Sequence, residues 1–475
     1  MSRRTSAAWT FAITAVALFM VSLDNLVVTT ALPVIRRDLG ASLQDLEWTV
    51  NAYTLTFAVL LLTGAALGDR FGRRRMFVIG LSIFTIGSAA AALAPSSAVL
   101  ILARAFQGVG GAIVTPLTLT IIVTAVSPER RALALGAWGG VAGLAVAVGP
   151  LVGGAIAQGA DWHWIFWVNV PIGIVAVVLA FARLDETRGP AGRLDLGGLA
   201  LASGGLLSFV WGVIHGNERG WTDPQILVAL ALGGALLAAF VAWEGRVDSP
   251  MLPLHLFRSR AFAAANAVSM LMYFGMFGSI FLLSQFFQVV QGLNPFEAGL
   301  RVLPWTAMPA VVAPIAGALV GRIGGRPILV TGMALMAVGL GWIAFVSSPI
   351  VAYGALVPAF VISGTGMGLF FAPTANIVLS AVRPTEVGKA SGANNTIREV
   401  GGVLGVAVLA SVFSANGSYA SPHEYVAGLV PAIWVGAAIV AAGAVVALAI
   451  PGRHRATQAI AERVSPALPD VDLAM

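Results

Sequence analysis

A short basic segment occurs twice in this chain, once in each half, and each copy lies between two long apolar runs. The first copy, residues 67–75, reads LGDRFGRRR, and the second, residues 319–326, reads LVGRIGGR. When the copies are aligned on their leucines, three pairs are identical: Arg70 with Arg322, Gly72 with Gly324, and Arg74 with Arg326. A tight basic turn that recurs in a matching place predicts a chain built from two related halves.

The apolar runs predict helices that cross a membrane. Hydrophobic residues make up 58% of the 475 positions and charged residues only 10%, which leaves no room for an ordinary soluble domain. A bilayer span needs about 20 mostly apolar residues. About fourteen runs reach that length, with boundaries uncertain by about 2–4 residues: 10–33, 48–67, 76–94, 98–124, 131–157, 164–182, 194–214, 224–243, 261–290, 298–320, 327–346, 351–378, 390–414 and 426–450.

The two basic turns follow the second and the tenth of these runs, so the halves stay in register only if two helices are inserted between them. The predicted fold class is therefore an all-α integral membrane protein with two six-helix bundles and an inserted helix pair. The predicted divisions are an N-terminal bundle (1–190), the inserted helices (191–250), a C-terminal bundle (251–452) and a cytoplasmic tail (453–475).

The positive charges predict the orientation. Of the 27 Lys and Arg residues, only Arg36, Arg37 and Arg219 fall in loops on the side opposite the N-terminus. Arg104, Arg301 and Arg398 lie within or beside spans, and the remaining basic residues share the side of the N-terminus. Since basic loops stay inside, both termini are predicted to be cytoplasmic, in the cell membrane. The net charge of +6 then reflects topology and indicates no nucleic-acid partner.

Several kinds of chemistry are excluded by composition. The chain has no cysteine, which rules out disulfides and thiol-ligated metals. A phosphate-binding loop needs a Gly-Lys-Ser/Thr ending, but Ala390 follows the single lysine, Lys389. We expect no nucleotide, no metal, no cofactor and no enzymatic activity. Energy must come from an ion gradient, a partner subunit or the gradient of the substrate itself.

The fifth span is rich in glycine around a proline. Gly140 is followed after eight residues by Gly149, Pro150 and then Gly153 and Gly154. Glycines four apart line one helix face and allow a neighbouring backbone to approach closely. Pro150 removes a backbone hydrogen bond, so we predict a bend there.

These segments resemble the major facilitator superfamily, and within it the fourteen-span drug:proton antiporters. The fifth-span string resembles the motif of exporters in that superfamily. Ala65 stands where the loop 2–3 motif usually has glycine, and His163 stands where arginine is commoner. The segments that carry the resemblance follow the order of the family: 23–33, 65–74, 104–108, 140–154 and 162–173.

Charged residues inside spans are costly and usually face a cavity and pair with one another. Asp24 in the first span and Arg104 in the fourth lie at similar depths, which permits an ion pair. The pair could be structural, or Asp24 could exchange between Arg104, a proton and a cationic substrate. Arg398 and Glu399 lie deep in the thirteenth span, and Glu399 is the second candidate proton site.

The remaining candidates divide into gating and substrate-binding residues. Glu47 and Glu297 are predicted to be solvated residues at the outer mouth. Asp69 can pair with arginine when the inner mouth is shut. The gating candidates are Asp69, Arg70, Gly72, Arg73, Arg74, Gly140, Gly149, Pro150, Gly153 and Gly154. The substrate-binding candidates are Asn51, Tyr53, Gln107, Tyr273, Phe277 and Asn394, helped by the Met and Phe side chains of the ninth span.

The sequence is therefore interpreted as a proton-driven exporter of lipophilic, cationic, drug-like molecules. Its partners are small-molecule substrates, protons and the lipid bilayer. The alternative in the same class is an exporter dedicated to one metabolite or antibiotic. A membrane-embedded enzyme or receptor is a third alternative, but no nucleophile–base pair or appended domain supports it.

Overall fold

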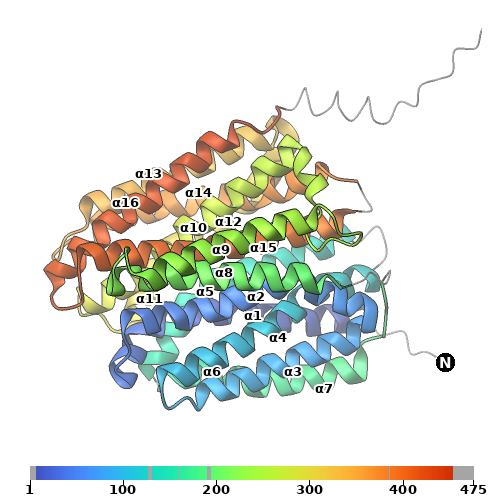
Figure 1. Ribbon diagram of the computed structural model, residues 1–475, viewed down its shortest axis with the longest axis horizontal. Coiled ribbons are helices and arrows are strands. Elements are labelled where there is room, and N and C mark those ends of the chain that lie inside the picture. Colours follow the sequence, from blue (N-terminus) through green and yellow to red (C-terminus); the bar gives the residue numbers. More distant parts are fainter. Residues whose placement is uncertain (1–6, 127–130, 160, 190–193, 384–385, 453–475) are drawn as a thin grey trace, which may run out of the picture.

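The computed structural model describes residues 7–126, 131–159, 161–189, 194–383 and 386–452, and these ranges are largely helical (Figure 1). The predicted tail, 453–475, lies outside them. In chain order the helices are α1 (Ala7–Leu39), α2 (Leu43–Phe71), α3 (Arg73–Ala92), α4 (Ser97–Ala125), α5 (Arg131–Gly159), α6 (Trp164–Trp167), α7 (Asn169–Arg183), α8 (Leu196–Arg219), α9 (Pro224–Glu244), the 3-10 helix η2 (Leu254–Arg258), α10 (Arg260–Val289), α11 (Pro295–Thr306), α12 (Met308–Ile323), α13 (Gly325–Val346), α14 (Tyr353–Ser380), α15 (Val387–Asn416) and α16 (Pro422–Ala447).

The number of long apolar helices agrees with the prediction. Thirteen segments in the described part are long and apolar enough to cross a membrane. Helix α5, with 29 residues, is not among these thirteen and adds a further helix of comparable length. The predicted all-α membrane fold is thus confirmed, and the protein crosses the membrane many times.

Proline breaks two of the predicted continuous spans. The run 164–182 is divided into α6 and α7 at Val168, and the run 298–320 into α11 and α12 at Ala307. Pro171 and Pro309 each follow the break within three residues. Because a proline ring lacks an N–H and clashes with the carbonyl four residues earlier, it interrupts the helical hydrogen-bond ladder at these points.

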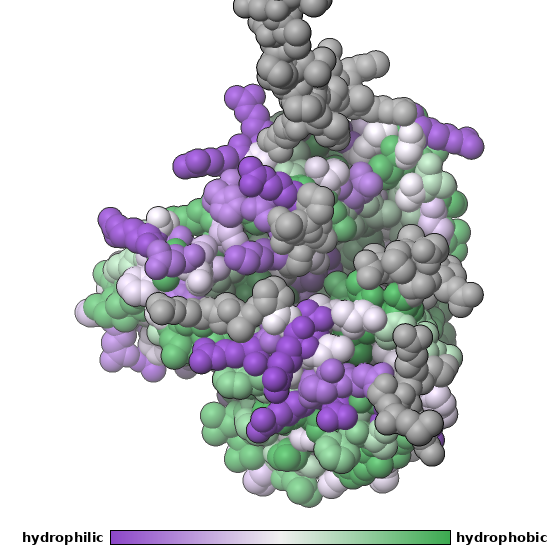
Figure 2. Space-filling view, turned by 90° about the vertical axis from the view of Figure 1, so that its right-hand side faces the viewer, coloured by the Kyte–Doolittle hydropathy of each residue, from purple (hydrophilic) through white to green (hydrophobic). Residues whose placement is uncertain are grey.

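The helices form two groups, α1–α7 and α10–α16, with α8 and α9 lying across the junction between them (Figure 1). Helix α8 packs against α9 and also against α2 and α15, one helix from each group. The start of α1 and the end of α16 lie at the same end of the molecule. We call this the arginine-rich end, because it also holds the α2–α3 and α12–α13 turns, and Figure 2 shows hydrophilic side chains gathered on it. The opposite end is called the far end.

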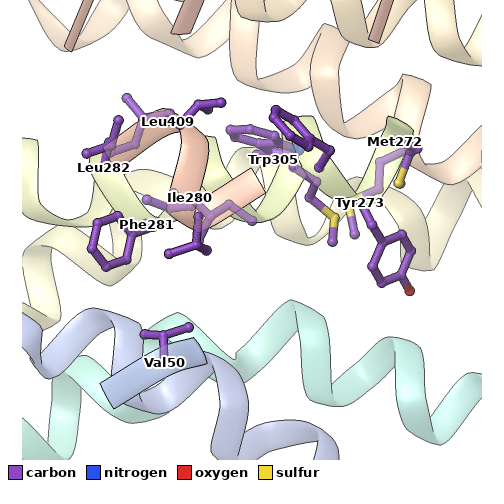
Figure 3. Packing of buried hydrophobic residues seen from close by; sticks show 14 of the residues in the cluster. Val50, Met272, Tyr273, Ile280, Phe281, Leu282, Trp305 and Leu409 are labelled. Atoms are coloured by element: carbon purple, nitrogen blue, oxygen red, sulfur yellow. The ribbon is translucent and has the colours of Figure 1, made fainter. Parts of the chain in front are cut away.

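The largest hydrophobic core cluster extends from one group of helices to the other. Most of the Met and Phe side chains of α10 are buried in it, so they pack against other helices instead of lining a cavity. Val50 of α2 points toward Ile280 and Phe281 of α10 across the junction (Figure 3). Side chains of the two groups therefore share one apolar core at this level of the molecule.

Candidate functional site

A buried ion pair lies inside the first group of helices. Asp24 of α1 accepts a hydrogen bond from the guanidinium of Arg104 on α4. Both side chains are fully buried. The second terminal nitrogen of Arg104, Nη2, has no hydrogen-bond partner. Taking two charges out of water costs several kcal/mol per ion, by the order of magnitude usual for proteins, so the pair depends on the polar groups around it.

Two amides complete the surroundings of Asp24. Gln107 and Asn169 each donate to Asp24 Oδ1 at 2.9 Å. The carbonyl oxygen of Gln107 accepts from Arg104 at 2.7 Å, so Gln107 contacts both members of the pair. Ser88 of α3 accepts from both amides, at 3.3 and 3.1 Å. Helices α4 and α7 thus supply the donors to one buried carboxylate of α1, and α3 supplies an acceptor that holds the two amides. Hydrogen bonds of this kind make a charge tolerable in an apolar interior.

Tyr53 connects this cluster to the junction between the helix groups. The guanidinium of Arg104 lies 4.2 Å from the centre of the Tyr53 ring, a cation–π contact. The Tyr53 hydroxyl donates to the backbone oxygen of Val21 at 3.1 Å. Glu399 of α15, in the second group, is close enough for its charge to interact with Tyr53.

A second polar cluster lies across the junction, on α10 and α15. Arg398 donates to the Tyr273 hydroxyl at 2.5 Å and covers the Tyr273 ring at 4.7 Å from its centre. The Phe277 ring stacks on that of Tyr273, with centroids 5.5 Å apart. Glu399 interacts electrostatically with both Arg398 and Tyr273. The structure therefore brings Glu399 toward both clusters, while Arg398 is held by α10.

The two candidate asparagines differ in their bonding. Asn51 of α2 is fully buried, and neither its amide nitrogen nor its oxygen has a partner. Asn394 of α15 donates to Asn266 at 3.1 Å and to Ser269 at 3.0 Å, so α10 satisfies it. A buried amide without partners is costly, so Asn51 has unused hydrogen-bonding capacity in this conformation.

The two basic turns have the same backbone conformation. Gly72 separates α2 from α3 with a φ of +107°, and Gly324 separates α12 from α13 with a φ of +85°. Each glycine donates its N–H to a carbonyl four residues earlier, at 3.0 Å. Side-chain-bearing residues rarely adopt such φ values. The matching turns support the relationship between the halves that the sequence predicts.

The first turn is held by two carboxylates. Asp69 accepts from Arg73 at 2.8 and 2.9 Å within the turn. Glu186, from the loop after α7, accepts from the backbone N–H groups of Arg74 and Arg75, where a helix N-terminus favours negative charge. Arg70 is exposed and lies near the Phe71 ring. The position of Asp69 is occupied by Gly321 in the second half, so that turn lacks the pair.

Replacing Gly72 with alanine is expected to destabilise the protein by more than the same change at Gly220. Both glycines have positive φ, so both variants carry backbone strain of about 1–3 kcal/mol. A Cβ at Gly72 would also lie 2.7 Å from the Glu186 carboxylate, whereas nothing lies within 4 Å of one at Gly220. Thermal unfolding of the purified variants checks this. Equal losses would mean that Glu186 contributes nothing to the turn.

Three glycines of α5 make close contacts with neighbouring helices. A Cβ on Gly149 would lie 2.7 Å from Leu26 Cβ, and one on Gly153 would lie 2.9 Å from Val27 Cα, so this face packs on α1. Gly154 faces the other group, where a Cβ would lie 2.8 Å from the Cα of Phe296 on α11. The carbonyl group of Pro150 is in turn close to Gly299 of α11. The string thus brings α5 against α1 and α11 at once, near the far end.

The two predicted mouth residues and the gating candidate Gly140 differ in their surroundings. Gly140 is exposed, and no atom lies within 4 Å of the Cβ it would carry, so it makes no close helix contact. Glu297 is exposed, as predicted, and closes the capping box of α11 with Asn294. The prediction that Glu47 is solvated is wrong, because the side chain is buried, with 1% exposure.

A sequence profile described as the Major Facilitator Superfamily matches residues 14–406. The chain belongs to the major facilitator superfamily. It is 34% identical over 451 residues to the tetracenomycin C resistance and export protein of Streptomyces glaucescens, covering 93% of this chain and 84% of that protein. It is 38% identical over 408 residues to multidrug resistance protein Stp of Mycobacterium tuberculosis, covering 85% and 75%. It is also 38% identical over 431 residues to the cephamycin export protein CmcT of Amycolatopsis lactamdurans, covering 89% and 88%.

Solved structures of other transporters share the major facilitator fold. A POT family transporter aligns with a TM-score of 0.67 at 14% identity, over 92% of this chain and 95% of that one. A bacterial homologue of the human lysosomal transporter Spinster aligns with a TM-score of 0.65 at 16% identity, over 98% and 100%. At these identities the likeness concerns the fold alone. Membership of this superfamily indicates a transporter of small molecules and not an enzyme.

The major facilitator segments that are separate in the sequence meet at Asp24. The first-span segment supplies Asp24, the fourth-span segment supplies Arg104 and Gln107, and the loop 5–6 segment supplies Asn169. Asn169 lies in the 162–173 segment but was not a site candidate, because its position after a loop suggests no contact with the first span. Ser88 and Glu186 carried no signal in the sequence.

Proposed function

We propose that the protein is a proton-coupled antiporter of the fourteen-span drug:proton family, which exports lipophilic, cationic compounds across the cytoplasmic membrane. The observation that carries the proposal is the buried pair of Asp24 and Arg104, in which one guanidinium nitrogen has no partner. An ionisable pair within spanning helices is costly, and such groups commonly lie on ion or proton pathways.

Proton binding at Asp24 removes the charge that attracts Arg104, Gln107 and Asn169. Since these three residues come from α4 and α7, loss of the charge weakens contacts among the helices of the first group. The freed guanidinium remains over the Tyr53 ring. A proton can thus alter the wall of the transport pathway without any covalent chemistry.

The substrate would bind along the junction near Asn51, Tyr53, Tyr273 and Phe277. Glu399 supplies a negative charge close to the rings of Tyr53 and Tyr273. Aromatic faces and a carboxylate together attract lipophilic cations. Asn51 offers an amide donor and acceptor without partners. We assign Glu399 as the second proton site and Arg398 as the residue that balances its charge.

The gating residues lie at the two ends of this pathway. At the arginine-rich end, Asp69 with Arg73, together with Arg70, Gly72 and Arg74, forms the turn that would move as the inner mouth opens. At the far end, the close packing of α5 on α11 through Pro150 and Gly154 would separate as the outer mouth opens. Gly140, with open space around it, would accommodate movement of α5.

The arginine-rich end faces the cytoplasm in this proposal, which makes both termini cytoplasmic. The support is the concentration of basic residues there, since basic loops remain inside during insertion. Reporter fusions placed after α16 and in the 220–223 loop measure this directly. An external C-terminus would contradict the orientation.

The relatives include exporters named for several drugs and exporters named for a single compound, so they support both a broad and a narrow substrate range. Multidrug resistance protein Stp is named for several drugs, whereas the cephamycin export protein CmcT is named for one. The second candidate function is therefore export of one specific metabolite or antibiotic.

Proton flux in vesicles reconstituted with the purified protein tests the function and separates the two candidates. A panel of cationic dyes and neutral antibiotics is added to one side, and the pH of the lumen is recorded. Proton movement with many cations supports the broad exporter, and movement with a single compound supports the dedicated one. No proton movement with any compound, together with measurable transport, would contradict antiport.

A further inference from the structure

Glu47 is a buried carboxylic acid at the far end that the proposed cycle does not yet use. It lies in the second turn of α2, is 1% exposed, and its Oε2 atom has no hydrogen-bond partner. Among the residues that the structure describes, no arginine forms an ion pair with it. An ionised carboxylate without a partner is too costly in such surroundings, so the side chain carries its proton in this conformation.

Glu47 lies beside contacts that join the two helix groups. We define the far-end seal as Arg36, Glu47, Gln285, Tyr419 and Tyr425. Arg36 is on α1, and Tyr419 is in the loop between α15 and α16. The Arg36 guanidinium lies 3.8 Å from the centre of the Tyr419 ring. Tyr419 donates to Gln285 of α10 at 2.6 Å, and its ring contacts that of Tyr425 at 5.4 Å. Glu47 is close enough to Tyr419 for a charge to interact with it.

Tyr419 itself stays neutral in the seal. Burial raises the pKa of the Tyr419 phenol above its ordinary value, and the charge of Arg36 acts in the opposite direction. The seal therefore contains one permanently charged side chain, Arg36, one neutral phenol that it covers, and one carboxyl group that can gain or lose a proton.

Among the cations of the helices around Glu47, Arg36 is the one that takes part in the seal. Helix α15 has no ionisable residue from Gly401 to its end, and the arginines of α3 are at the opposite end of the molecule. On α4, Arg104 is bound to Asp24, and on α2 itself Asp45 forms the capping box with Ser42. On α8, His215 is bonded to the Trp211 carbonyl at 3.0 Å, Glu218 is exposed, and Arg219 is exposed and donates to Gln225. On α1, Arg37 and Asp38 are exposed, which leaves Arg36.

We propose that Glu47 is a proton-operated switch of the far-end seal, neutral when the seal is closed and ionised when it opens. On opening, the Glu47 carboxyl releases its proton to water at the far end, and the carboxylate attracts Arg36. Arg36 then leaves Tyr419, which breaks a contact between the helix groups and replaces it with a pair inside the first group. On closing, a proton from the far side neutralises Glu47 and Arg36 returns to the ring.

This inference rests on the proposed function, and it adds a role that differs from coupling. The proton on Glu47 exchanges with the far side only, so it is not transported. An acidic exterior therefore favours the closed seal, and an alkaline exterior favours the open one, independently of whether substrate is present.

The test measures the width of the far end as a function of pH. The chain has no cysteine, so spin labels can be attached at Arg37→Cys on α1 and Ala415→Cys on α15, both exposed. The full-length protein also carries Asp24→Asn and Glu399→Gln, which remove the two proton sites proposed above, and is studied in lipid nanodiscs without substrate. Pulsed electron–electron double resonance should show a longer distance between the two spin labels as the pH rises.

Glu47→Gln in this labelled protein should abolish the pH response and keep the short distances at every pH. Glu297→Gln is the matched control, because Glu297 is an exposed carboxylate at the same end, and glutamine preserves its capping bond. A pH response that persists in Glu47→Gln, or is absent from the labelled parent, would overturn the inference.

Infrared difference spectra provide an independent measurement. The spectrum of the wild type at neutral pH, after subtraction of the spectrum of Glu47→Gln, should contain the C=O band of a protonated carboxylic acid. A carboxylate band in its place would overturn the inference. Neither experiment involves substrate, so failure of antiport and failure of the switch give separate results.

Discussion

Replacing Asp24 with asparagine is expected to abolish export against a gradient while leaving downhill movement of substrate. Asparagine keeps the size of the side chain and can still accept a hydrogen bond from Arg104, but it cannot bind and release a proton. The site is then fixed in an imitation of its protonated state. Uptake of substrate into inverted vesicles, with and without an imposed pH gradient, measures the two activities separately.

Asp38→Asn is the matched control for this variant. Asp38 lies on the same helix but is exposed and accepts from Trp162 at 2.7 Å, outside the buried cluster. Its replacement should leave gradient-driven export close to wild type. A purely structural pair makes a different prediction: Asp24→Asn combined with Arg104→Gln would restore export, because two neutral groups can replace a buried pair.

Replacing Gly154 with leucine is expected to stop transport without preventing membrane insertion. The added Cβ would lie 2.8 Å from the Cα of Phe296, and the rest of the side chain must push α5 and α11 apart. Overpacking of this kind costs about 1–3 kcal/mol, and here it separates the two helix groups at the far end. Transport of a fluorescent cation, normalised to the amount of inserted protein, measures the effect.

Gly234→Leu provides the comparison, because Gly234 on α9 is exposed and nothing lies within 4 Å of its potential Cβ. This variant should transport at the wild-type rate. Wild-type transport by Gly154→Leu as well would show that the α5–α11 contact does not take part in the cycle.

The helices of this protein could be predicted from the sequence because membrane spans depend on local composition. About 20 apolar residues in a row identify a span whatever its neighbours are. The proline breaks at Val168 and Ala307 were missed, although Pro171 and Pro309 were visible. Proline does not always break a helix: α4, α5 and α14 continue through internal prolines, so its effect depends on packing.

The partners of Asp24 could be predicted only in part. The depth of Asp24 and Arg104 along their helices suggested that they could pair, because helix rise converts position into depth. Rotation about the helix axis also decides which side chains meet, and packing of neighbouring helices sets it. Asn169 and Ser88 therefore could not be found from spacing.

The burial of a charged residue near a helix end also could not be predicted from the sequence. Glu47 was expected in solvent because it lies near the end of its span and beside a loop. It is buried instead, and it lies close enough to Tyr419 of the second helix group for a charge to interact with that ring. A charge near the membrane surface can thus be buried by another part of the chain, which hydropathy along one helix does not reveal.

Proton release on substrate binding tests the central claim most directly. Purified wild-type protein in weakly buffered detergent solution receives a transported cation, and the pH is recorded with an indicator dye. The account predicts proton release by the wild type and little or none by Asp24→Asn, with binding of the cation confirmed in both. Equal release by the two proteins would contradict Asp24 as the coupling site and would direct the same measurement to Glu399.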